Sequence, residues 1–328
     1  MNDWKNVWIL AEVNHGKLSA TALELLHAGR QLADALGEKL CAVMLGYQVE
    51  KFIPELFEYG ADTVYVCDDA HLQNYVDDVY AKTLAAMVRE YKPNKFLLPA
   101  TNMGRSLSAK TAVFVGTGLT ADATDVKINA EDGQLHATRP TFGGNLMATI
   151  TCKNTRPEMC SLRPMAYEKA ARVSGRRGEV VNFPFQADKY TSLAKFVEFI
   201  KNDGDGLDLS EAEVIVAGGR GLGKADGFTL LKKLAQRLGG AVAASRAPVD
   251  SGWIDYRYQI GLTGRTVKPK VYIACGISGQ IQHMAGMSGA DVIVAINKDP
   301  QAPIMKVANY AVEGDLYEVI PAMLEALH

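Results

Sequence analysis

The 328-residue sequence has little cysteine, no long apolar run and no excess of charge of one sign. Its five cysteines, at positions 41, 67, 152, 160 and 275, form no CxxC pair and no Cys/His ladder. That pattern excludes a disulfide framework and a zinc site of the usual spacing. No stretch approaches the roughly 20 apolar residues of a membrane span. We therefore expect a protein of a reducing, cytoplasmic compartment, without membrane insertion.

The balance of charge excludes another class of partner. Lys and Arg number 35 and Asp and Glu 37, so the formal net charge is -2. A nucleic-acid-binding protein normally carries a basic patch or field, and none is evident here. We expect no nucleic-acid partner.

The common catalytic motifs are also missing. The sequence contains no GxSxG elbow, no HExxH pair and no Walker GxxxxGK[ST] loop. Cys275 lies inside the apolar run VYIAC, which favours a core residue over a nucleophile. Nothing in these motifs predicts a stand-alone catalytic site or a metal site.

What the sequence does contain is an α/β rhythm. Hydrophobic residues make up 48% of the chain, enough for two cores, and the length suggests two domains. In the first segment the pattern predicts strands at 7–13, 40–46, 63–67 and 96–101, separated by helices at 21–37, 49–59, 76–91 and 104–116. This alternation predicts a parallel sheet with helical crossovers.

The rhythm changes between residues 117 and 185. Short β-like pieces (DVKINAEDGQLHATRP, NLMATITC and GEVVNFPF) predict an antiparallel extension, and a helix is expected near 190–201. The Gly- and Asp-rich stretch KNDGDGLDLSEA then marks a domain boundary. We expect an N-terminal α/β domain at 1–204 and a C-terminal domain at 205–328, with a hinge near 202–208.

The second segment repeats the α/β alternation. Strands are predicted at 213–219, 241–246, 271–276, 292–297 and 310–315, with helices near 225–239 and 279–287 and at the C-terminus. The expected fold is therefore a two-domain α/β protein. Each domain is built on a mostly parallel sheet with flanking helices, and the second is doubly wound.

Unusual residues follow the strands of the second segment, where ligands of parallel sheets bind. The GGRGLGK turn brings Arg220 and four glycines to a helix start, which suits a phosphate, although a tight turn alone uses glycine too. A second loop, GISGQIQH, ends at His283, and two such loops together suit a dinucleotide. His283 could instead be a capped or surface histidine, and Arg246 a solvated charge.

Two further sets of residues leave alternatives open. The polar stretch 256–270 is either a lid over a ligand, with Thr263 and Arg265 as donors, or a turn at Thr263–Gly264. Asn297 and Asp315 each close a strand, where they could bond an adenosine half. Three arginines beside prolines (Arg139, Arg156 and Arg163) either brace an interface or are solvated.

An ordered set of motifs in the second segment closely resembles the alpha subunit of electron-transfer flavoproteins. These are GGRG at 218–221, ASRAPVDSGW at 244–253, GLTG at 261–264, GISGQIQH at 276–283, AINKDPQAPI at 295–304 and GDL at 314–316. The first segment resembles the same subunit more loosely, through WILAE, PATNMGRSL, GLTADATD and RPTFGGN.

The resemblance implies FAD as cofactor and a heterodimer with a beta subunit, which the N-terminal domain contacts. It implies electron exchange with acyl-CoA dehydrogenase-like or other flavin dehydrogenases, so the chain is an electron-transfer subunit more than an enzyme. The N-terminal stretch looks more like anaerobic bacterial members, some of which bifurcate electrons from NADH to ferredoxin and a second acceptor. The alternatives are a nucleotide-binding regulatory or scaffold protein and an NAD-dependent oxidoreductase. The missing acidic residue after a GxGxxG turn argues against the latter.

The resemblance also implies site residues. Thr263 would hydrogen-bond flavin N5, Arg246 would favour anionic reduced flavin, and His283 would help in the same direction. Leu262 departs from many relatives, which carry Gln there. The residues implied to bind the cofactor are Arg220, Ser245, Arg246, Ile260, Gly261, Leu262, Thr263, Ser278, Gly279, Gln280, Ile281, Gln282, His283, Asn297, Asp315 and Leu316.

Overall fold

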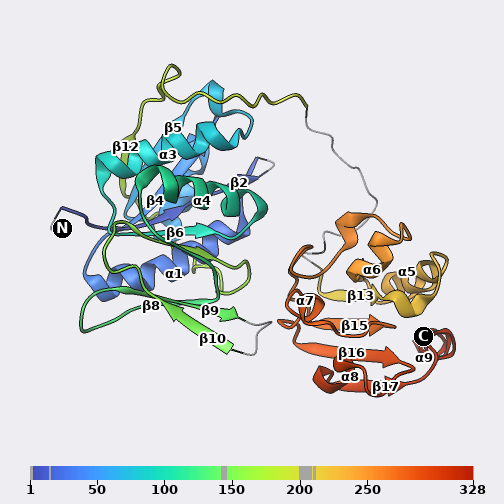
Figure 1. Cartoon of the computed structure of the whole chain (residues 1–328). Helices are drawn as coiled ribbons and strands as arrows, with labels where there is room; N and C mark the ends of the chain where they lie inside the picture. The colour runs from blue at the N-terminus through green and yellow to red at the C-terminus, as the bar shows by residue number, and fades with distance from the viewer. Residues whose placement is uncertain (1–2, 15, 142–145, 199–208, 210–211, 328) are drawn as a thin grey trace. The chain divides into compact units, whose positions relative to one another are not determined.

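The chain divides into two compact units, Met1–Ile200 and Lys201–His328, each with its own sheets and its own core (Figure 1). The structure is a computed structural model that describes residues 3–14, 16–141, 146–198, 209 and 212–327. The α/β fold class is confirmed in both units. The predicted boundary after residue 204 and the predicted hinge at 202–208 lie outside the described residues.

The first unit is built on a parallel sheet of seven strands in the order β12-β5-β4-β1-β6-β11-β7. The strands are β1 (Val7–Leu10), β4 (Leu40–Gly46), β5 (Thr63–Asp68), β6 (Lys95–Pro99), β7 (Leu119–Ala123), β11 (Glu158–Leu162) and β12 (Glu179–Asn182). The helices are α1 (Ala20–Leu36), α2 (Ile53–Glu58), α3 (Asp77–Tyr91) and α4 (Asn102–Val115), with 3₁₀ turns η1 (Glu50–Phe52) and η2 (Ala70–Leu72).

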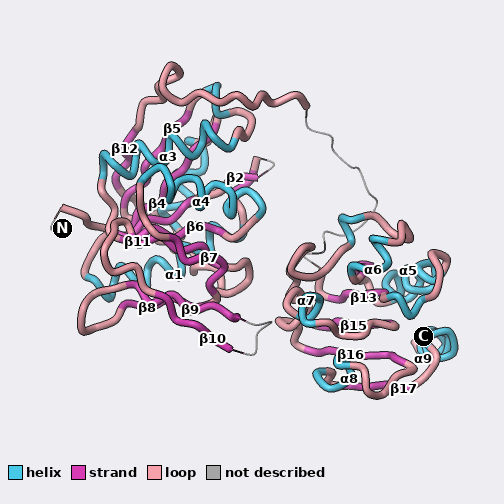
Figure 2. Tube along the Cα trace, in the orientation of Figure 1, coloured by secondary structure: helices cyan, strands magenta, loops and turns pink. Residues whose placement is uncertain are grey.

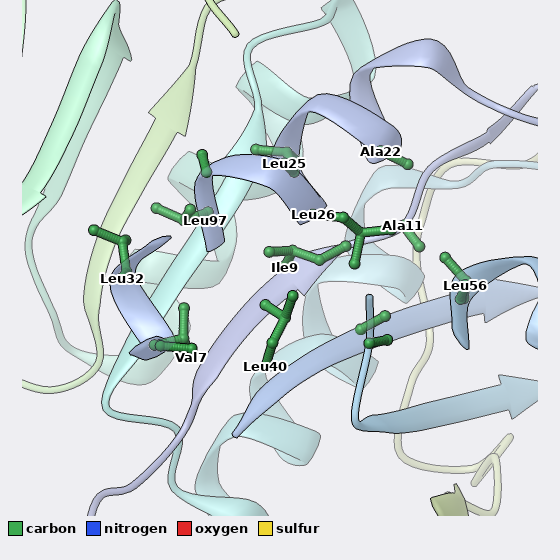
Figure 3. Packing of buried hydrophobic residues seen from close by; sticks show 14 of the residues in the cluster. Val7, Ile9, Ala11, Ala22, Leu25, Leu26, Leu32, Leu40, Leu56 and Leu97 are labelled. Atoms are coloured by element: carbon green, nitrogen blue, oxygen red, sulfur yellow. The ribbon is translucent and has the colours of Figure 1, made fainter. Parts of the chain in front are cut away.

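Helix α1 covers one face of this sheet, and α3 and α4 cover the other (Figure 1). Ser19 caps α1 by accepting a hydrogen bond from the Ala22 amide, and Gly37 ends it in the left-handed conformation. Leu25 and Leu26 of α1 belong to the same buried cluster as Ile9 of β1, part of which Figure 3 shows. Burying each such leucine stabilises the fold by about 1.5–3 kcal/mol, which fixes the helix to the central strand.

The antiparallel extension is confirmed in part. Strands β8 (Asp125–Ile128), β9 (Leu135–Thr141) and β10 (Leu146–Ile150) form an antiparallel sheet, which Figure 2 draws beside the main sheet; β2 (Val13–Asn14) and β3 (Lys17–Leu18) form a small hairpin. The antiparallel assignment of GEVVNFPF is wrong, because β12 pairs in parallel with β5. Gly178 permits this pairing, since a Cβ there would lie 2.4 Å from the Asp62 carbonyl oxygen.

The helix predicted near 190–201 is also wrong over residues 191–198, which form no helix. The side chains that would make its apolar stripe, Leu193, Phe196 and Val197, are exposed in this chain. Short amphipathic helices depend on a surface that buries their apolar face, and residues 191–198 have no such surface within the described chain.

The second unit contains a five-stranded parallel sheet in the order β14-β13-β15-β16-β17. The strands are β13 (Val214–Gly218), β14 (Ala241–Ala244), β15 (Val271–Cys275), β16 (Val292–Asn297) and β17 (Tyr310–Glu313). The helices are α5 (Gly227–Arg237), α6 (Arg246–Asp250), α7 (Ile281–Met284), α8 (Pro303–Val307) and α9 (Leu316–Ala326), with 3₁₀ turns η4 (Arg220–Leu222) and η5 (Tyr256–Tyr258).

This sheet has a core on each face, as expected of a doubly wound domain. Helices α5 and α9 pack on one face, and the segments around α7 and α8 pack on the other. The strand order reverses between β14-β13 and β15-β16-β17, so the carboxyl ends of β13 and β15 flank a crevice where such sheets bind ligands. In the described residues, no helix has the length and apolar character needed to cross a bilayer.

Candidate functional site

A cavity of about 620 Å³ lies at the carboxyl ends of β13, β14, β15 and β16. Its walls come from five segments: the turn after β13, helix α6, the loop before β15, the loop leading into α7 and the turn after β16. The volume falls in the usual range for sites that hold a small molecule or cofactor. The fold therefore forms one hollow where the sequence predicts binding.

Most of the predicted residues meet at this cavity. Twelve of the sixteen line it: Arg220, Ser245, Arg246, Ile260, Gly261, Leu262, Thr263, Ser278, Gln280, Gln282, His283 and Asn297. The remaining four, Gly279, Ile281, Asp315 and Leu316, are not part of the lining.

Three of these four have structural roles nearby. Gly279 has a φ of 83°, and a Cβ there would lie 2.4 Å from the Ile304 amide nitrogen, so the loop passes α8 closely. Asp315 caps α9 by accepting from the Tyr317 amide, and it pairs with Lys298 at 2.8 Å, which lowers its pKa. Leu316 packs in the core between α5 and α9.

Two glycine turns form the floor of the cavity. The Gly221 amide donates to the Gly276 carbonyl oxygen at 2.9 Å. A Cβ on Gly219 would lie 2.2 Å from that same oxygen, and Gly276 has a φ of 62°. The two loops therefore touch through bare backbone, which brings the turn after β13 against the turn after β15.

Arg246 stands at the start of α6, where its side chain is largely exposed. Its Nε lies 3.1 Å from Asp250 Oδ2, one helical turn away, and both residues line the cavity. The guanidinium group of Arg246 is therefore solvated, as one alternative expected. Because Arg246 also lines the cavity, its fixed positive charge would act on a ligand bound there. Asp250 offsets part of that charge.

Thr263 is held by two partners. Gln259 Nε2 donates to Thr263 Oγ1 at 3.0 Å, and the Tyr256 hydroxyl donates to the Thr263 carbonyl oxygen. The segment makes a tight turn, since the Gly264 amide donates to the Gly261 carbonyl oxygen. Of the two alternatives for this stretch, the turn at Thr263–Gly264 is present, and Gly261, Leu262 and Thr263 of that turn line the cavity.

His283 is buried, with 6% of its surface exposed, so the capped or surface alternative is wrong. Its Nδ1 lies 3.0 Å from the Ile260 carbonyl oxygen, which only accepts, so Nδ1 carries the proton. Nε2 then accepts from the Tyr272 hydroxyl at 2.9 Å. Burial lowers the pKa of His283 to about 4, so the ring is neutral at pH 7. The neutral ring therefore adds no positive charge of its own to the cavity wall at pH 7.

The side chain of Asn297 is engaged with the backbone. Its Nδ2 donates to the Ile277 carbonyl oxygen at 2.9 Å, and its Oδ1 accepts from the Asp299 amide at 3.0 Å. Asn297 thereby ties the end of β16 to the loop after β15, on the wall of the cavity.

The donor set fits a dinucleotide flavin. Gly221 and Gly276 line the cavity without side chains, which suits the approach of a pyrophosphate, and Arg220 and Arg246 provide permanent positive charge. The hydroxyl group of Thr263 and the amides of Gln280 and Gln282 are suited to the polar edges of a ring system. Together these groups match two chemical parts of FAD, the pyrophosphate and the ring system.

Several lining residues escaped the sequence analysis, among them Asp250, Gln259 and Asp299. A spacing of four residues from a predicted site residue could have found two of them: Asp250 follows Arg246 by four, and Gln259 precedes Thr263 by four. Asp299, in the turn after β16, does not lie four residues from a predicted site residue, so this spacing could not have found it.

The arginines beside prolines are partly explained inside the first unit. Arg163 makes a bidentate pair with Asp122, and Arg156 lies 3.1 Å from the buried Glu158. Arg139 Nε is buried without a hydrogen-bond partner in the described structure. Cys275 is buried with its pKa raised to about 12, which confirms a core residue in place of a nucleophile.

A second, smaller cavity of about 130 Å³ lies at the carboxyl end of β1 in the first unit. Glu12 is buried in its wall and accepts hydrogen bonds from Asn14 Nδ2 at 2.6 Å and Thr101 Oγ1 at 2.7 Å. The cavity is well below the several hundred Å³ that nucleotide-sized ligands occupy.

Comparison with known proteins identifies both units. Residues 7–188 match the electron transfer flavoprotein domain, and residues 208–288 match the electron transfer flavoprotein FAD-binding domain. The chain is 48% identical to the electron transfer flavoprotein subunit alpha of Thermoanaerobacterium thermosaccharolyticum, over 100% of this chain and 99% of the relative. It is 49% identical to the protein FixB of Clostridium saccharobutylicum, over 98% and 96%.

A third relative carries a more specific name. The chain is 42% identical to the acryloyl-CoA reductase electron transfer subunit beta of Anaerotignum propionicum, over 100% of this chain and 96% of that protein.

Proposed function

The chain belongs to the alpha-subunit family of the electron-transfer flavoproteins, with FAD as its cofactor, and from that premise we propose that it carries electrons between protein partners as half of a heterodimer with a beta subunit. The observation that carries the proposal is the 620 Å³ cavity, where a glycine floor, two arginines and Thr263 converge. FAD in this cavity would supply a ring that accepts and releases electrons.

The chain's own residues would divide the binding among them. Arg220 and the glycine turns would hold the pyrophosphate, and Asn297 would support the adenosine half. Arg246 would lie beside the ring, where a fixed cation stabilises negative charge that develops on reduction. Thr263 would donate a hydrogen bond to the ring edge. His283 would shape the wall as a neutral group, because burial lowers its pKa.

The electron partners follow from the family and one relative. We propose a CoA-ester dehydrogenase or related flavin dehydrogenase as one partner, which the name of the Anaerotignum propionicum relative supports. In an electron-bifurcating complex, NADH would supply the electrons, and ferredoxin and an enoyl-CoA or similar acceptor would receive them. The resemblance of the N-terminal stretch to anaerobic bacterial members of the family supports that version.

The nucleotide-binding scaffold is less well supported. It relied on the parallel sheet of the first unit, but the cavity at the end of β1 holds about 130 Å³. A site for an adenine nucleotide needs several times that volume.

The test is co-expression of this chain with its beta subunit, followed by a visible spectrum, a count of released flavin and a reductive titration. One FAD per heterodimer, reduced in one-electron steps and reoxidised by a dehydrogenase partner, is the result expected of a carrier. Two FAD per heterodimer with reduction by NADH would support bifurcation. A colourless heterodimer that takes up no FAD would refute the proposal.

A further inference from the structure

Gln259 is a buried polar residue on the wall of the cavity. It is 3% exposed, and it lies beside Ala244, at the end of β14, in an isolated parallel bridge. Its carbonyl oxygen accepts from the Arg265 amide at 2.8 Å, and a Cβ on Gly264 would lie 2.3 Å from that oxygen. The backbone of Gly264 and Arg265 is therefore packed closely against the backbone of Gln259.

The side chain of Gln259 reaches across the turn to Thr263. Its Nε2 lies 3.0 Å from Thr263 Oγ1. An amide nitrogen only donates, so the hydroxyl oxygen of Thr263 is the acceptor in this pair. The hydroxyl hydrogen then needs another direction, and the described residues offer it no acceptor.

Hydrogen bonds also hold the backbone of Thr263 and of the turn in place. The Tyr256 hydroxyl holds its carbonyl oxygen, and the Ile260 amide ties the base of the turn to the Ala244 carbonyl oxygen at 2.9 Å. Gln259 holds the hydroxyl oxygen of Thr263 and Tyr256 holds its backbone, and Thr263 lines the cavity, so its hydroxyl hydrogen can be directed into the cavity.

We propose that Gln259 is a positioning residue: by donating to Thr263 Oγ1, it directs the hydroxyl hydrogen of Thr263 toward the flavin. This inference rests on the proposed function, in which FAD occupies the cavity. A donor aimed at the ring gains strength when the ring becomes more negative, so Gln259 stabilises the reduced cofactor over the oxidised one.

The decisive variant is Gln259→Glu, which keeps the size of the side chain and reverses the polarity of the bond. A carboxylate only accepts, so the Thr263 hydroxyl would donate to it and its hydrogen would leave the cavity. The introduced charge also disfavours reduced flavin by itself. Thr263→Val separates the two effects, because it leaves the charge and removes the hydroxyl.

The measurement is the midpoint potential of FAD in the heterodimer, by redox titration of the wild type, Gln259→Glu, Thr263→Val and the double variant. We expect Gln259→Glu to weaken the preference for reduced flavin about tenfold more in the wild-type background than in the Thr263→Val background. For a one-electron step, tenfold corresponds to about 59 mV. Equal shifts in the two backgrounds would overturn the proposal.

Gln259→Met provides a second variant without added charge. It removes the donor at similar length and leaves the Thr263 hydroxyl free to rotate, so we expect a smaller loss in the same direction that also disappears in the Thr263→Val background. FAD content and melting temperature, measured in parallel, identify variants that fail to fold. Absence of FAD from the wild-type heterodimer would refute the proposed function, whereas FAD bound with no coupling between positions 259 and 263 would refute this inference alone.

Discussion

Nε2 of His283 accepts a hydrogen bond from the hydroxyl group of Tyr272, 2.9 Å away, where both side chains are buried beneath the cavity. Because Nδ1 of the same ring bonds the Ile260 carbonyl oxygen, the imidazole joins strand β15, helix α7 and the turn that bears Thr263. Its neutral form is thus part of the structure of the cavity wall.

This arrangement predicts a loss of stability in mild acid. The pKa of His283 is lowered from 6.5 to about 4, so between these values the unfolded state binds more protons than the folded state. The free energy of unfolding is at its full value above pH 6.5. It falls as the pH drops toward 4, by about 3 kcal/mol in all, because the unfolded state takes up the proton more readily. Hydrogen exchange of the β15 amides, followed between pH 7 and pH 4, measures this effect locally.

Substitution of His283 provides the comparison. In His283→Gln the pH dependence of β15 exchange protection should become flatter than in the wild type. His71→Gln removes an exposed histidine of the other unit and should leave the β15 profile unchanged. A wild-type profile that is flat from pH 6.5 to 4 would contradict the neutral buried ring.

The pair Arg246 and Asp250 predicts potential shifts of opposite sign. Arg246→Ala should lower the midpoint potential of bound FAD, since a cation beside the ring favours the more negative, reduced form. Asp250→Asn should raise it, because Asp250 lies 3.1 Å from the Arg246 Nε and offsets its charge. Both side chains are well exposed, so each effect should stay within about tenfold in relative affinity and shrink with added salt.

Redox titrations at low and high ionic strength would measure both shifts. Asp315→Asn is a suitable charge-matched control, since Asp315 lies outside the cavity lining and pairs with Lys298. If Asp250→Asn lowered the potential, Asp250 would not act by offsetting Arg246.

Much of the fold was predictable because hydrophobic periodicity survives in the structure. The runs at 40–46, 271–275 and 292–297 are buried or half-buried strands, and the helices between them lie on both faces of parallel sheets. Strand direction was less visible, since Glu179–Asn182 reads the same whether its neighbour runs parallel or antiparallel. The helix expected near 190–201 failed over 191–198 because periodicity cannot show whether an apolar stripe has a surface to cover.

The cavity was predictable where chemistry follows a strand end directly. Arg220 lies two residues after β13, Ser278 three residues after β15 and Asn297 at the end of β16, and all three line the cavity. Gln259 was missed because its role comes from a contact across a turn. Asp315 was expected to contact ligand, but an aspartate before a helix is equally suited to capping it, which is its contact here.

The contact between the two glycine turns predicts that Gly219→Ala damages the cavity. The added Cβ would lie 2.2 Å from the Gly276 carbonyl oxygen, so backbone must move, at a cost of about 1–3 kcal/mol in stability. The turn proposed to hold the pyrophosphate would move with it, so FAD should bind more weakly by about tenfold or more. Denaturation and FAD titration of the heterodimer measure the two effects.

Gly239→Asn is the matched control for this prediction. Gly239 follows the end of α5 with a φ of 64° and has open space around it, and asparagine tolerates that conformation better than other side chains. Its FAD affinity should equal that of the wild type. Wild-type FAD affinity in Gly219→Ala would show that the close contact does not shape the site.

The first unit contains a buried ion pair whose two halves should respond unequally to substitution. Lys95 Nζ lies 2.7 Å from Glu158 Oε1, and both side chains are inaccessible to solvent. Glu158 also contacts Arg156 Nη2 at 3.1 Å and accepts from the Leu135 amide at 2.6 Å. The carboxylate of Glu158 therefore accepts from three donors. If Lys95 is substituted, the carboxylate keeps the other two donors, Arg156 and the Leu135 amide.

Glu158→Leu should cost about 3–5 kcal/mol in the stability of the first unit, because it leaves a buried ammonium group and a buried amide without their acceptor. Lys95→Met should cost less, since Arg156 still neutralises the carboxylate. Because the Leu135 amide begins β9, Glu158→Leu should also loosen the antiparallel sheet, and hydrogen exchange of the β9 amides should rise in that variant more than in Lys95→Met. Equal losses in the two variants would show that the pair acts as an isolated salt bridge, without the link to β9.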